Sequence, residues 1–384
     1  MNRDIINVPR RQHLKIDRVE PIETGTKRME LTISTLTPLW TGGVEPGKVD
    51  RIHETGILGS LRWWYEAIVR GLGGTACDPS KGECRFDAEK YQKSTATDER
   101  QRLRDAGLCD VCQLFGATGW RRRFRLEVVN DQTAPLWAGN QPLNIRPPGR
   151  NRGWFLPPGR MGTFTLRIHG DATSVKHLLA LFRFVERWGS LGAKPQLGYG
   201  VIAIQNWDAV KNNLNDWSWR QAAQSFGNNS SAPNADLPDL RRFGFFRYRF
   251  QPPDKAWWSR IGGFERVVAQ VRPFAARTVP VPPVLKNAWR FQHWQPSWED
   301  EHTFWGRVAT DRIRGKVAVS WAYPRTNGWE IRGSAWLSGV EPEPVWQLLS
   351  NAAIVNQTLG VTGGTMDTMR PQTTDQLLNV LENL

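Results

Sequence analysis

The spacing of apolar and polar residues divides the first half of the chain into short strands and two amphipathic helices. Apolar residues recur every three to four positions over Ile57 to Leu72 and over Thr173 to Trp188, which predicts helices. Four segments predict strands: Met29 to Leu36, Phe124 to Asn130, Gly162 to Ile168 and Tyr199 to Gln205. The resulting order, βαββαβ, indicates an α+β domain of the ferredoxin-like or RNA-recognition type.

The second half resembles the same βαββαβ order, with less distinct boundaries. Expected strands are Phe243 to Phe250, Val317 to Tyr323 and Glu330 to Leu337, and expected helices are Ser259 to Val271, Glu343 to Ala353 and Thr374 to Leu384. Residues 224–239 (QSFGNNSSAPNADLPD) have the composition of a linker. We therefore expect tandem ferredoxin-like domains, at 1–223 and 240–384, joined by the linker 224–239.

Both predicted helices of the first half carry arginines on a second face and lie next to glycine turns. Arg62, Glu66 and Arg70 form a stripe at four-residue spacing behind Gly42 and Gly43. The second helix ends in GSLGAKPQLGYG, residues 189–200, which lacks the features of a P-loop or dinucleotide fingerprint. A solvated face and an ordinary turn explain each feature alone. Their repetition favours a surface that binds a phosphate backbone, with donors from Lys194 and Gln196.

The charge and aromatic content of the chain favour an RNA partner. The 384 residues include 51 Lys and Arg against 37 Asp and Glu, a formal net charge of +14, and 20 Trp residues. Basic residues interleaved with aromatic ones suit single-stranded RNA, because every base offers a face for stacking. No apolar run approaches membrane-spanning length, and the N-terminal segment has no signal-like apolar core, so we expect a cytoplasmic protein without a membrane partner.

All four cysteines lie in one segment that follows the first helix, an insertion at 75–115. Cys109 and Cys112 have the two-residue spacing of a zinc knuckle, whereas Cys77 and Cys84 are more widely spaced. Four thiolates favour one structural zinc ion, because they leave no open coordination position for a catalytic water. Two disulfides, free thiols and a redox pair are the alternatives.

Several motifs together resemble a known family. They are TPLWTGG, the helix segment HETGILGSLRWWYEAIVRGLGG, CQLFGATG and the loop GSLGAKPQLGYG, all within roughly the first 205 residues. The chain resembles the RAMP proteins of type III CRISPR–Cas systems, most of all the large first subunit of the Cmr (type III-B) effector complex. The loop departs from the family in having Lys194, Pro195, Gln196 and Leu197 where several arginines are common, and His53 and Glu54 replace a common arginine.

The resemblance implies a non-catalytic subunit that binds crRNA or the guide–target RNA duplex at one end of the assembly, for antiviral defence. Its implied partners are crRNA, target RNA and the other Cmr-complex subunits, including the backbone RAMP proteins. The candidate RNA-binding residues are Arg51, His53, Arg62, Arg70, Arg121, Arg122, Arg123, Arg125, Lys194, Gln196, Tyr199, Arg312, Arg314 and Lys316, with Phe124 or Trp120 as a base-stacking ring.

Three other functions fit parts of the pattern. The main alternative is a metal-independent RAMP endoribonuclease that processes CRISPR RNA, with His53 as general base. In that case cleavage of RNA without metal would depend on His53. An RNA-binding protein outside CRISPR and a glycine-loop enzyme acting on nucleotides are the others. His169 and His177 are expected to be surface or packing residues.

Overall fold

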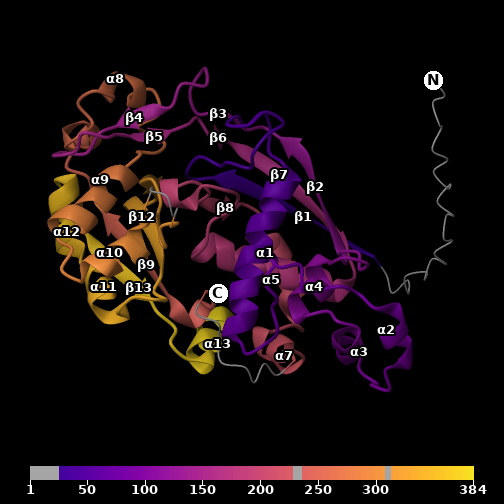
Figure 1. Cartoon of the computed structure of the whole chain (residues 1–384). Coiled ribbons are helices and arrows are strands. Elements are labelled where there is room, and N and C mark those ends of the chain that lie inside the picture. The colour runs from indigo at the N-terminus through magenta and orange to yellow at the C-terminus, as the bar shows by residue number, and fades with distance from the viewer. Residues whose placement is uncertain (1–25, 228–235, 308–312) are drawn as a thin grey trace, which may run out of the picture.

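The computed structural model describes residues 26–227, 236–307 and 313–384 (Figure 1). The fold is α+β, with antiparallel sheets and helices packed against them. The N-terminal segment, the middle of the predicted linker and Arg312 lie outside the described residues. Within the described ranges, no helix is long and apolar enough to cross a membrane.

The first half forms a four-stranded antiparallel sheet whose strand order is β2-β7-β1-β8. The strands are β1 (Lys27–Thr35), β2 (Phe124–Asp131), β7 (Thr163–Gly170) and β8 (Ile202–Ile204). Side chains alternate in burial along β1, so that Leu31 and Ile33 face the core. Helices α1 (Glu54–Gly71) and α5 (Ala172–Arg187) pack into the same core. All six predicted elements are confirmed, although the last strand, predicted over Tyr199 to Gln205, is reduced to Ile202–Ile204.

The second half repeats this strand arrangement. Its sheet has the order β10-β12-β9-β13. If the four strands of each sheet are numbered along the chain, both sheets have the spatial order 2-3-1-4. The strands are β9 (Phe243–Phe250), β10 (Val317–Val319), β12 (Gly328–Trp336) and β13 (Thr365–Met369), and β11 (Tyr323–Arg325) pairs with β12. The predicted strands are confirmed, although Val317 to Tyr323 is divided between β10 and β11.

Two predicted helices of the second half are wrong as continuous elements. In place of Ser259 to Val271 the chain forms the 3₁₀ helix η4 (Trp257–Arg260) and the short α8 (Val268–Val271). Gly263 lies between them at φ +94°, a conformation that ends a helix. In place of Glu343 to Ala353 the chain forms α11 (Pro342–Leu349) and α12 (Ala352–Leu359), because Asn351 caps a new helix. The last prediction is confirmed as α13 (Thr374–Glu382).

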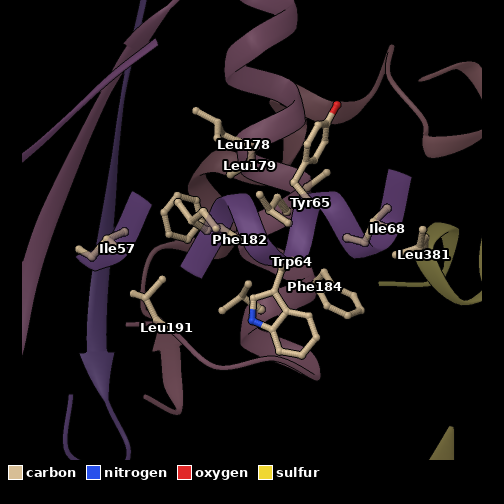
Figure 2. Packing of buried hydrophobic residues seen from close by; sticks show 14 of the residues in the cluster. Ile57, Trp64, Tyr65, Ile68, Leu178, Leu179, Phe182, Phe184, Leu191 and Leu381 are labelled. Atoms are coloured by element: carbon tan, nitrogen blue, oxygen red, sulfur yellow. The ribbon is translucent and has the colours of Figure 1, made fainter. Parts of the chain in front are cut away.

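The hydrophobic cores extend across the boundary between the two halves. Figure 2 shows Trp64 of α1 beside Phe184 of α5, and Leu381 of α13 close to Ile68 at the end of α1. Trp40 and Tyr199 of the first half, in turn, belong to the core of the second. The two halves are therefore packed together through apolar side chains on both sides, whatever the exact domain boundary.

Shorter elements complete the structure. The cysteine insertion contains α2 (Ala88–Lys93), α3 (Glu99–Asp105) and α4 (Asp110–Phe115). Between β2 and β7 lie two small hairpin sheets, formed by β3 (Ala134–Pro135) with β6 (Arg160–Met161) and by β4 (Leu143–Ile145) with β5 (Trp154–Leu156). The others are η1 (Pro195–Leu197), α6 (Trp207–Val210), η2 (Lys211–Leu214), α7 (Trp219–Gln224), η3 (Leu240–Arg242), α9 (Pro282–Asn287), the π-helical turn η5 (Ala288–Gln292) and α10 (Trp298–Trp305).

Candidate nucleic-acid interface and metal site

The four cysteines converge as the sequence predicts. Their Sγ atoms all lie within 4.8 Å of one another, and Cys77 Sγ is 3.6 Å from Cys112 Sγ. Sulfur atoms around tetrahedral zinc lie about 3.8 Å apart, given a Zn–S bond of about 2.3 Å. Backbone N–H groups of Cys109 and Cys112 donate to Cys84 Sγ and Cys109 Sγ at 3.4 Å, which favours thiolates there. All four are free cysteines, so the disulfide alternative is wrong.

The polar stripe of α1 faces this cysteine insertion. Arg62 donates from Nε to Glu66 Oε1 at 2.9 Å, from Nη1 to the carbonyl of Gly116 at 3.2 Å and from Nη2 to Cys112 Sγ at 3.3 Å. Arg70 donates from Nη2 to the carbonyl of Cys77 at 2.8 Å, and its side chain is only 9% exposed. Both solvated-face and phosphate-binding interpretations of Arg70 are therefore wrong, because its donors are used inside the protein. Arg62 is likewise engaged by the insertion.

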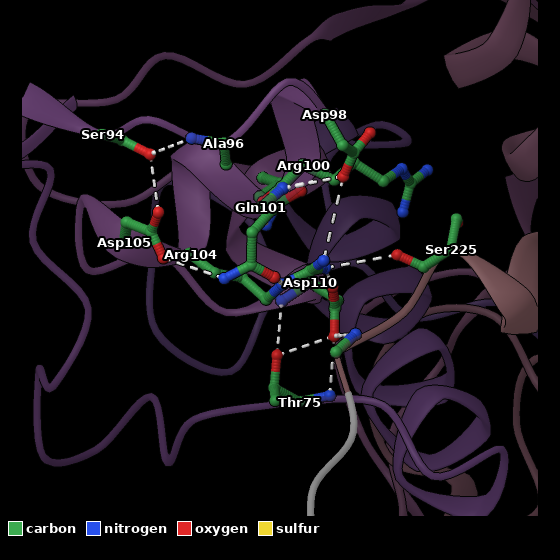
Figure 3. Close-up of polar contacts among 12 residues, drawn as sticks. Thr75, Ser94, Ala96, Asp98, Arg100, Gln101, Arg104, Asp105, Asp110 and Ser225 are labelled. Atoms are coloured by element: carbon green, nitrogen blue, oxygen red, sulfur yellow. Dashed lines mark hydrogen bonds and ion pairs between the residues drawn. The ribbon is translucent and has the colours of Figure 1, made fainter. Parts of the chain in front are cut away.

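A second polar network holds the insertion to the body of the protein (Figure 3). Asp110, whose side chain is fully buried, accepts from both the backbone N–H and the hydroxyl of Thr75 at 2.7 Å. It also accepts from Arg104 Nη1 at 2.8 Å and from the backbone N–H of Gly227, beyond α7, at 3.1 Å. Arg104 Nη1 donates to the carbonyl of Ser225 at 3.2 Å. This carboxylate was not among the site residues predicted from the sequence, although its position between Cys109 and Cys112 was a usable signal.

The glycine loop 189–200 packs against the second half instead of opening toward a ligand. A Cβ atom on Gly198 would lie 2.6 Å from both Pro282 Cγ and Trp321 Cδ1. Trp321 Nε1 donates to the carbonyl of Leu197 at 2.9 Å. Tyr199 is 1% exposed and its hydroxyl donates to the carbonyl of Pro157, so its assignment to the RNA site is wrong. The glycines here permit close contact between protein segments.

On the same loop, the side chains of Lys194 and Gln196 lie at the surface. Lys194 is the one non-glycine residue with positive φ (62°) among the described residues, and its Nζ lies 4.1 Å from the ring centroid of Trp40. Partial burial lowers the pKa of Lys194. The side chain of Gln196 is exposed, while its carbonyl accepts from Lys286 Nζ at 2.6 Å. Both side chains thus remain available at the edge of the loop.

Arg51 and His53 precede α1 on an exposed loop. Arg51 is 54% exposed and donates from Nη1 to Glu54 Oε2 at 3.3 Å. His53 Nε2 lies 2.7 Å from Asp50 Oδ1, and this hydrogen bond lowers the pKa of Asp50. The His53 side chain is 15% exposed. The pair supplies the oriented histidine that the ribonuclease alternative requires.

The arginines that enter β2 have different environments. Arg121 is exposed and forms no ion pair with any residue that the structure describes. Arg122 donates to the carbonyl of Phe124, Arg123 pairs with Glu99 at 2.6 Å, and Arg125 pairs with Glu127 at 2.6 Å. Phe124 is 4% exposed, so the expectation that it stacks on a base is wrong. Trp120, half-buried, is covered on one side by Arg123 at 5.5 Å.

The basic cluster of the second half is only partly described. Arg314 is exposed ahead of β10. Lys316 donates from Nζ to the carbonyl of Ser338 at 2.7 Å and lies 5.4 Å from the ring of Trp336, so its charge is engaged internally. Arg314 and Lys316 belong to the second sheet region and Arg121 to Arg125 to the first.

One basic segment escaped our sequence analysis altogether. Between Asp131 and Asp171 the chain contains no acidic residue, yet it includes the exposed Arg146, Arg150 and Arg152 on the β4–β5 hairpin. The absence of acidic residues over so long a segment was the signal that could have identified it.

Comparison with known proteins finds a family match over part of the chain. Residues 32–203 match the RAMP superfamily. Among solved structures, Cmr1 from Pyrococcus furiosus is similar at 15% identity and a TM-score of 0.40, over 83% of this chain and 90% of that one. A chain of the type III-B Cmr-beta complex bound to cognate target RNA is similar at 12% identity and a TM-score of 0.40, over 86% and 99%.

Cmr6 from Pyrococcus furiosus is similar at 18% identity and a TM-score of 0.25, over 47% of this chain and 98% of that one. No curated protein matches the sequence. The matched residues 32–203 run from within β1 to within β8, and so include every strand of the first sheet, α1, α5 and the cysteine insertion. This segment of the chain is therefore similar to the RAMP superfamily.

Proposed function

We propose that the chain is a non-catalytic, RNA-binding subunit of a type III-B CRISPR Cmr effector complex. In this role it binds crRNA or the guide–target duplex at one end of the assembly, next to the backbone RAMP proteins, in the cytoplasm. The observation that carries the proposal is the RAMP superfamily match over residues 32–203, which contains all the motifs of the resemblance. The net charge of +14 supports an anionic partner.

The proposal includes tandem ferredoxin-like domains. The two sheets share one strand order, and each places its first and third strands at the centre. This shared topology supports an internal duplication, in which each half contributes one βαββαβ unit. The additional segments, such as the cysteine insertion and the β4–β5 hairpin, are then extensions of that unit.

The RNA surface that we propose is smaller than the sequence predicts. We leave out the partly buried candidates whose side chains donate to backbone carbonyls, such as Arg62, Arg122 and Lys316, and His53, which is held by Asp50. The remaining candidates are Arg51, Arg121, Arg123, Arg125, Lys194, Gln196 and Arg314. Arg121 is the strongest of these, because its charge is not neutralised by a neighbour in the part of the chain that the structure describes. Arginine is suited to this task, since its planar guanidinium binds phosphate oxygens in pairs.

We also propose that the cysteine cluster holds one structural zinc ion through Cys77, Cys84, Cys109 and Cys112. The geometry and the all-sulfur donor set support this choice of metal. Bound zinc would cross-link the two ends of an insertion whose own apolar core contains only Leu103, Leu108 and Cys112 as buried members.

Incubation of the purified chain with labelled RNA in the presence of EDTA tests the function directly. We expect RNA binding that weakens steeply with salt, and intact RNA after the incubation. Sequencing of RNA that co-purifies with the chain from its native host would then show whether CRISPR spacers are enriched. Absence of RNA binding by the wild-type chain would contradict the proposal.

The His53–Asp50 pair keeps one alternative open, a metal-independent RAMP endoribonuclease. A carboxylate that holds the imidazole in one orientation is the usual support for a catalytic histidine. If RNA is cleaved in EDTA, and if His53→Ala abolishes cleavage while binding persists, the non-catalytic assignment is wrong.

A further inference from the structure

We propose that the β4–β5 hairpin and the neighbouring η5 turn form an arginine–aromatic platform that binds single-stranded RNA. The platform consists of Arg146, Arg150, Arg152, Phe155 and Phe291. It lies outside the residues that the sequence motifs indicated. The inference deepens the proposed function and rests on it, because it takes RNA as the ligand.

The hairpin has one buried and one exposed face. Leu143, Ile145 and Leu156 are at most 3% exposed and join the core of the second half. Asn144 and Phe155 are cross-strand partners in the register, so they occupy the opposite face together. Arg146 follows Asn144 by two residues and is also exposed. The buried face thus fixes which side chains the hairpin presents outward.

Packing of the hairpin against the second half holds this face in place. A Cβ atom on Gly263 would lie 2.6 Å from the carbonyl oxygen of Arg146, and Asn287 Nδ2 donates to the carbonyl of Pro148 at 3.5 Å. In Figure 1 the hairpin lies beside α8 and α9. The platform therefore stands on a buried support and includes residues of both halves.

Two aromatic rings are exposed on the platform. Phe155 is 60% exposed and Phe291 is 46% exposed, which is unusual for phenylalanine in a protein with large cores. The guanidinium carbon of Arg150 lies 3.8 Å from the centroid of the Phe291 ring, and that of Arg290 lies 5.0 Å from it. Phe291 belongs to a π-helical turn. Such turns are rare in proteins as a whole, but many of those that occur are at functional sites.

The three arginines of the hairpin are not paired with acidic side chains that the structure describes, although Arg290 beside Phe291 pairs with Glu301 at 2.8 Å. Arg146, Arg150 and Arg152 form no ion pair with any described residue, and no acidic residue occurs between Asp131 and Asp171. Three exposed guanidinium groups next to exposed rings match the two chemical parts of a single strand, its phosphates and its unpaired bases. An acidic protein partner would satisfy the charges, but it would not need exposed aromatic rings on the same hairpin and turn. The combination favours RNA.

Fluorescence anisotropy with a short labelled single strand of RNA, and with the same RNA annealed to its complement, tests the platform. Replacing Phe155 and Phe291 by alanine should weaken single-strand binding about fivefold or more, and duplex binding much less. Replacing Arg146, Arg150 and Arg152 by alanine should lower the slope of log affinity against log salt by about 2, since each lost phosphate contact removes about 0.7.

Matched controls separate the platform from general charge and from unfolding. Arg28 on β1, Arg85 in the cysteine insertion and Arg220 on α7 are exposed and lie on other elements of the first half, so their alanine variant removes the same charge. Trp298→Ala removes another exposed ring, one that is 65% exposed. Both control variants should bind RNA within about twofold of the wild type at moderate salt. Melting temperatures should stay unchanged in all variants.

The outcomes distinguish the inference from the proposed function. If the wild-type chain binds no RNA, both fail. If the wild type binds and the platform variants bind equally well, or if the arginine controls lose as much affinity, only the platform is disproved. Variants that bind RNA normally but no longer assemble with the other subunits would identify a protein interface and also overturn the inference.

Discussion

Arg62 Nη2 lies 3.3 Å from Cys112 Sγ and so joins the polar face of α1 to the cysteine cluster. The same guanidinium donates to Glu66, which is 3% exposed. A site with four thiolates around Zn²⁺ has a net charge of −2, and a partly buried arginine beside it offsets part of that charge. The stripe on α1 is therefore a support for the insertion, and its arginines orient the cysteines.

Zinc content and its dependence on Arg62 can be measured together. We expect native mass spectrometry to show one zinc ion per chain, lost in Cys109→Ser. Arg62→Met should keep the ion but bind it about 10- to 100-fold more weakly in a chelator competition. Arg220→Met, which removes an exposed arginine from α7, is the matched control. A wild-type chain that folds without metal would refute the site.

Variants at Arg70 and Arg121 should separate effects on stability from effects on RNA binding. Arg70→Met leaves the carbonyls of Cys77 and Pro238 without this donor, so we expect a loss of about 1–3 kcal/mol in the free energy of unfolding and no change in RNA affinity per folded molecule. Arg121→Ala should leave stability within about 0.5 kcal/mol and lower the salt slope by about 0.7. Urea titration and filter binding measure the two effects. An unchanged slope in Arg121→Ala would remove this residue from the RNA surface.

Gly198 and Gly47 test whether the glycine loop is a packing element. Both have positive φ, of 90° and 78°, but a Cβ on Gly47 meets nothing within 4 Å. Gly47→Ala should therefore cost only the backbone strain of about 1 kcal/mol. Gly198→Ala adds contact with Pro282 and Trp321 and should cost about 1–3 kcal/mol more in urea denaturation. Equal losses in the two variants would argue against close packing at Gly198.

From the lowered pKa of the buried His177 we predict how the stability of the fold changes in mild acid. Burial, helped by the charge of Arg100, lowers the pKa of His177 to about 4 in the folded state from its ordinary 6.5. Below pH 6.5 the unfolded chain takes up a proton that the folded chain does not bind until about pH 4. The free energy of unfolding should therefore fall by up to about 3 kcal/mol as pH decreases through this window.

His177→Phe should flatten this dependence, because phenylalanine does not titrate and suits the contacts with Tyr65 and Trp217. The surface variant His169→Gln should keep the wild-type slope, since His169 lies on β7 with its side chain 30% exposed. Urea denaturation should be measured between about pH 4.5 and 7. This range covers most of the interval between the pKa of His177 in the folded chain and its ordinary value. A His177→Phe profile parallel to the wild type would contradict the assignment.

The local pattern of apolar and polar residues was sufficient to predict most elements of the fold. The period of apolar residues identified α1, α5 and the four strands of the first sheet, because each buries one continuous face. It failed over Ser259 to Val271, where Gly262 and Gly263 interrupt an apolar run that has helical spacing. The cysteine spacing likewise identified the cluster, since tetrahedral coordination restricts which separations along the chain are useful.

The sequence by itself determined the order of elements in the first half, the grouping of the thiols and the match of residues 32–203 to the RAMP superfamily. Only the tertiary structure decided which charged residues remain accessible. Arg70 and Arg121 are the same residue type in the sequence. In the structure, Arg70 donates to carbonyls of the insertion, whereas Arg121 is exposed. Burial of a charge depends on contacts between segments distant in sequence, and for Arg70 these include Pro238, beyond α7.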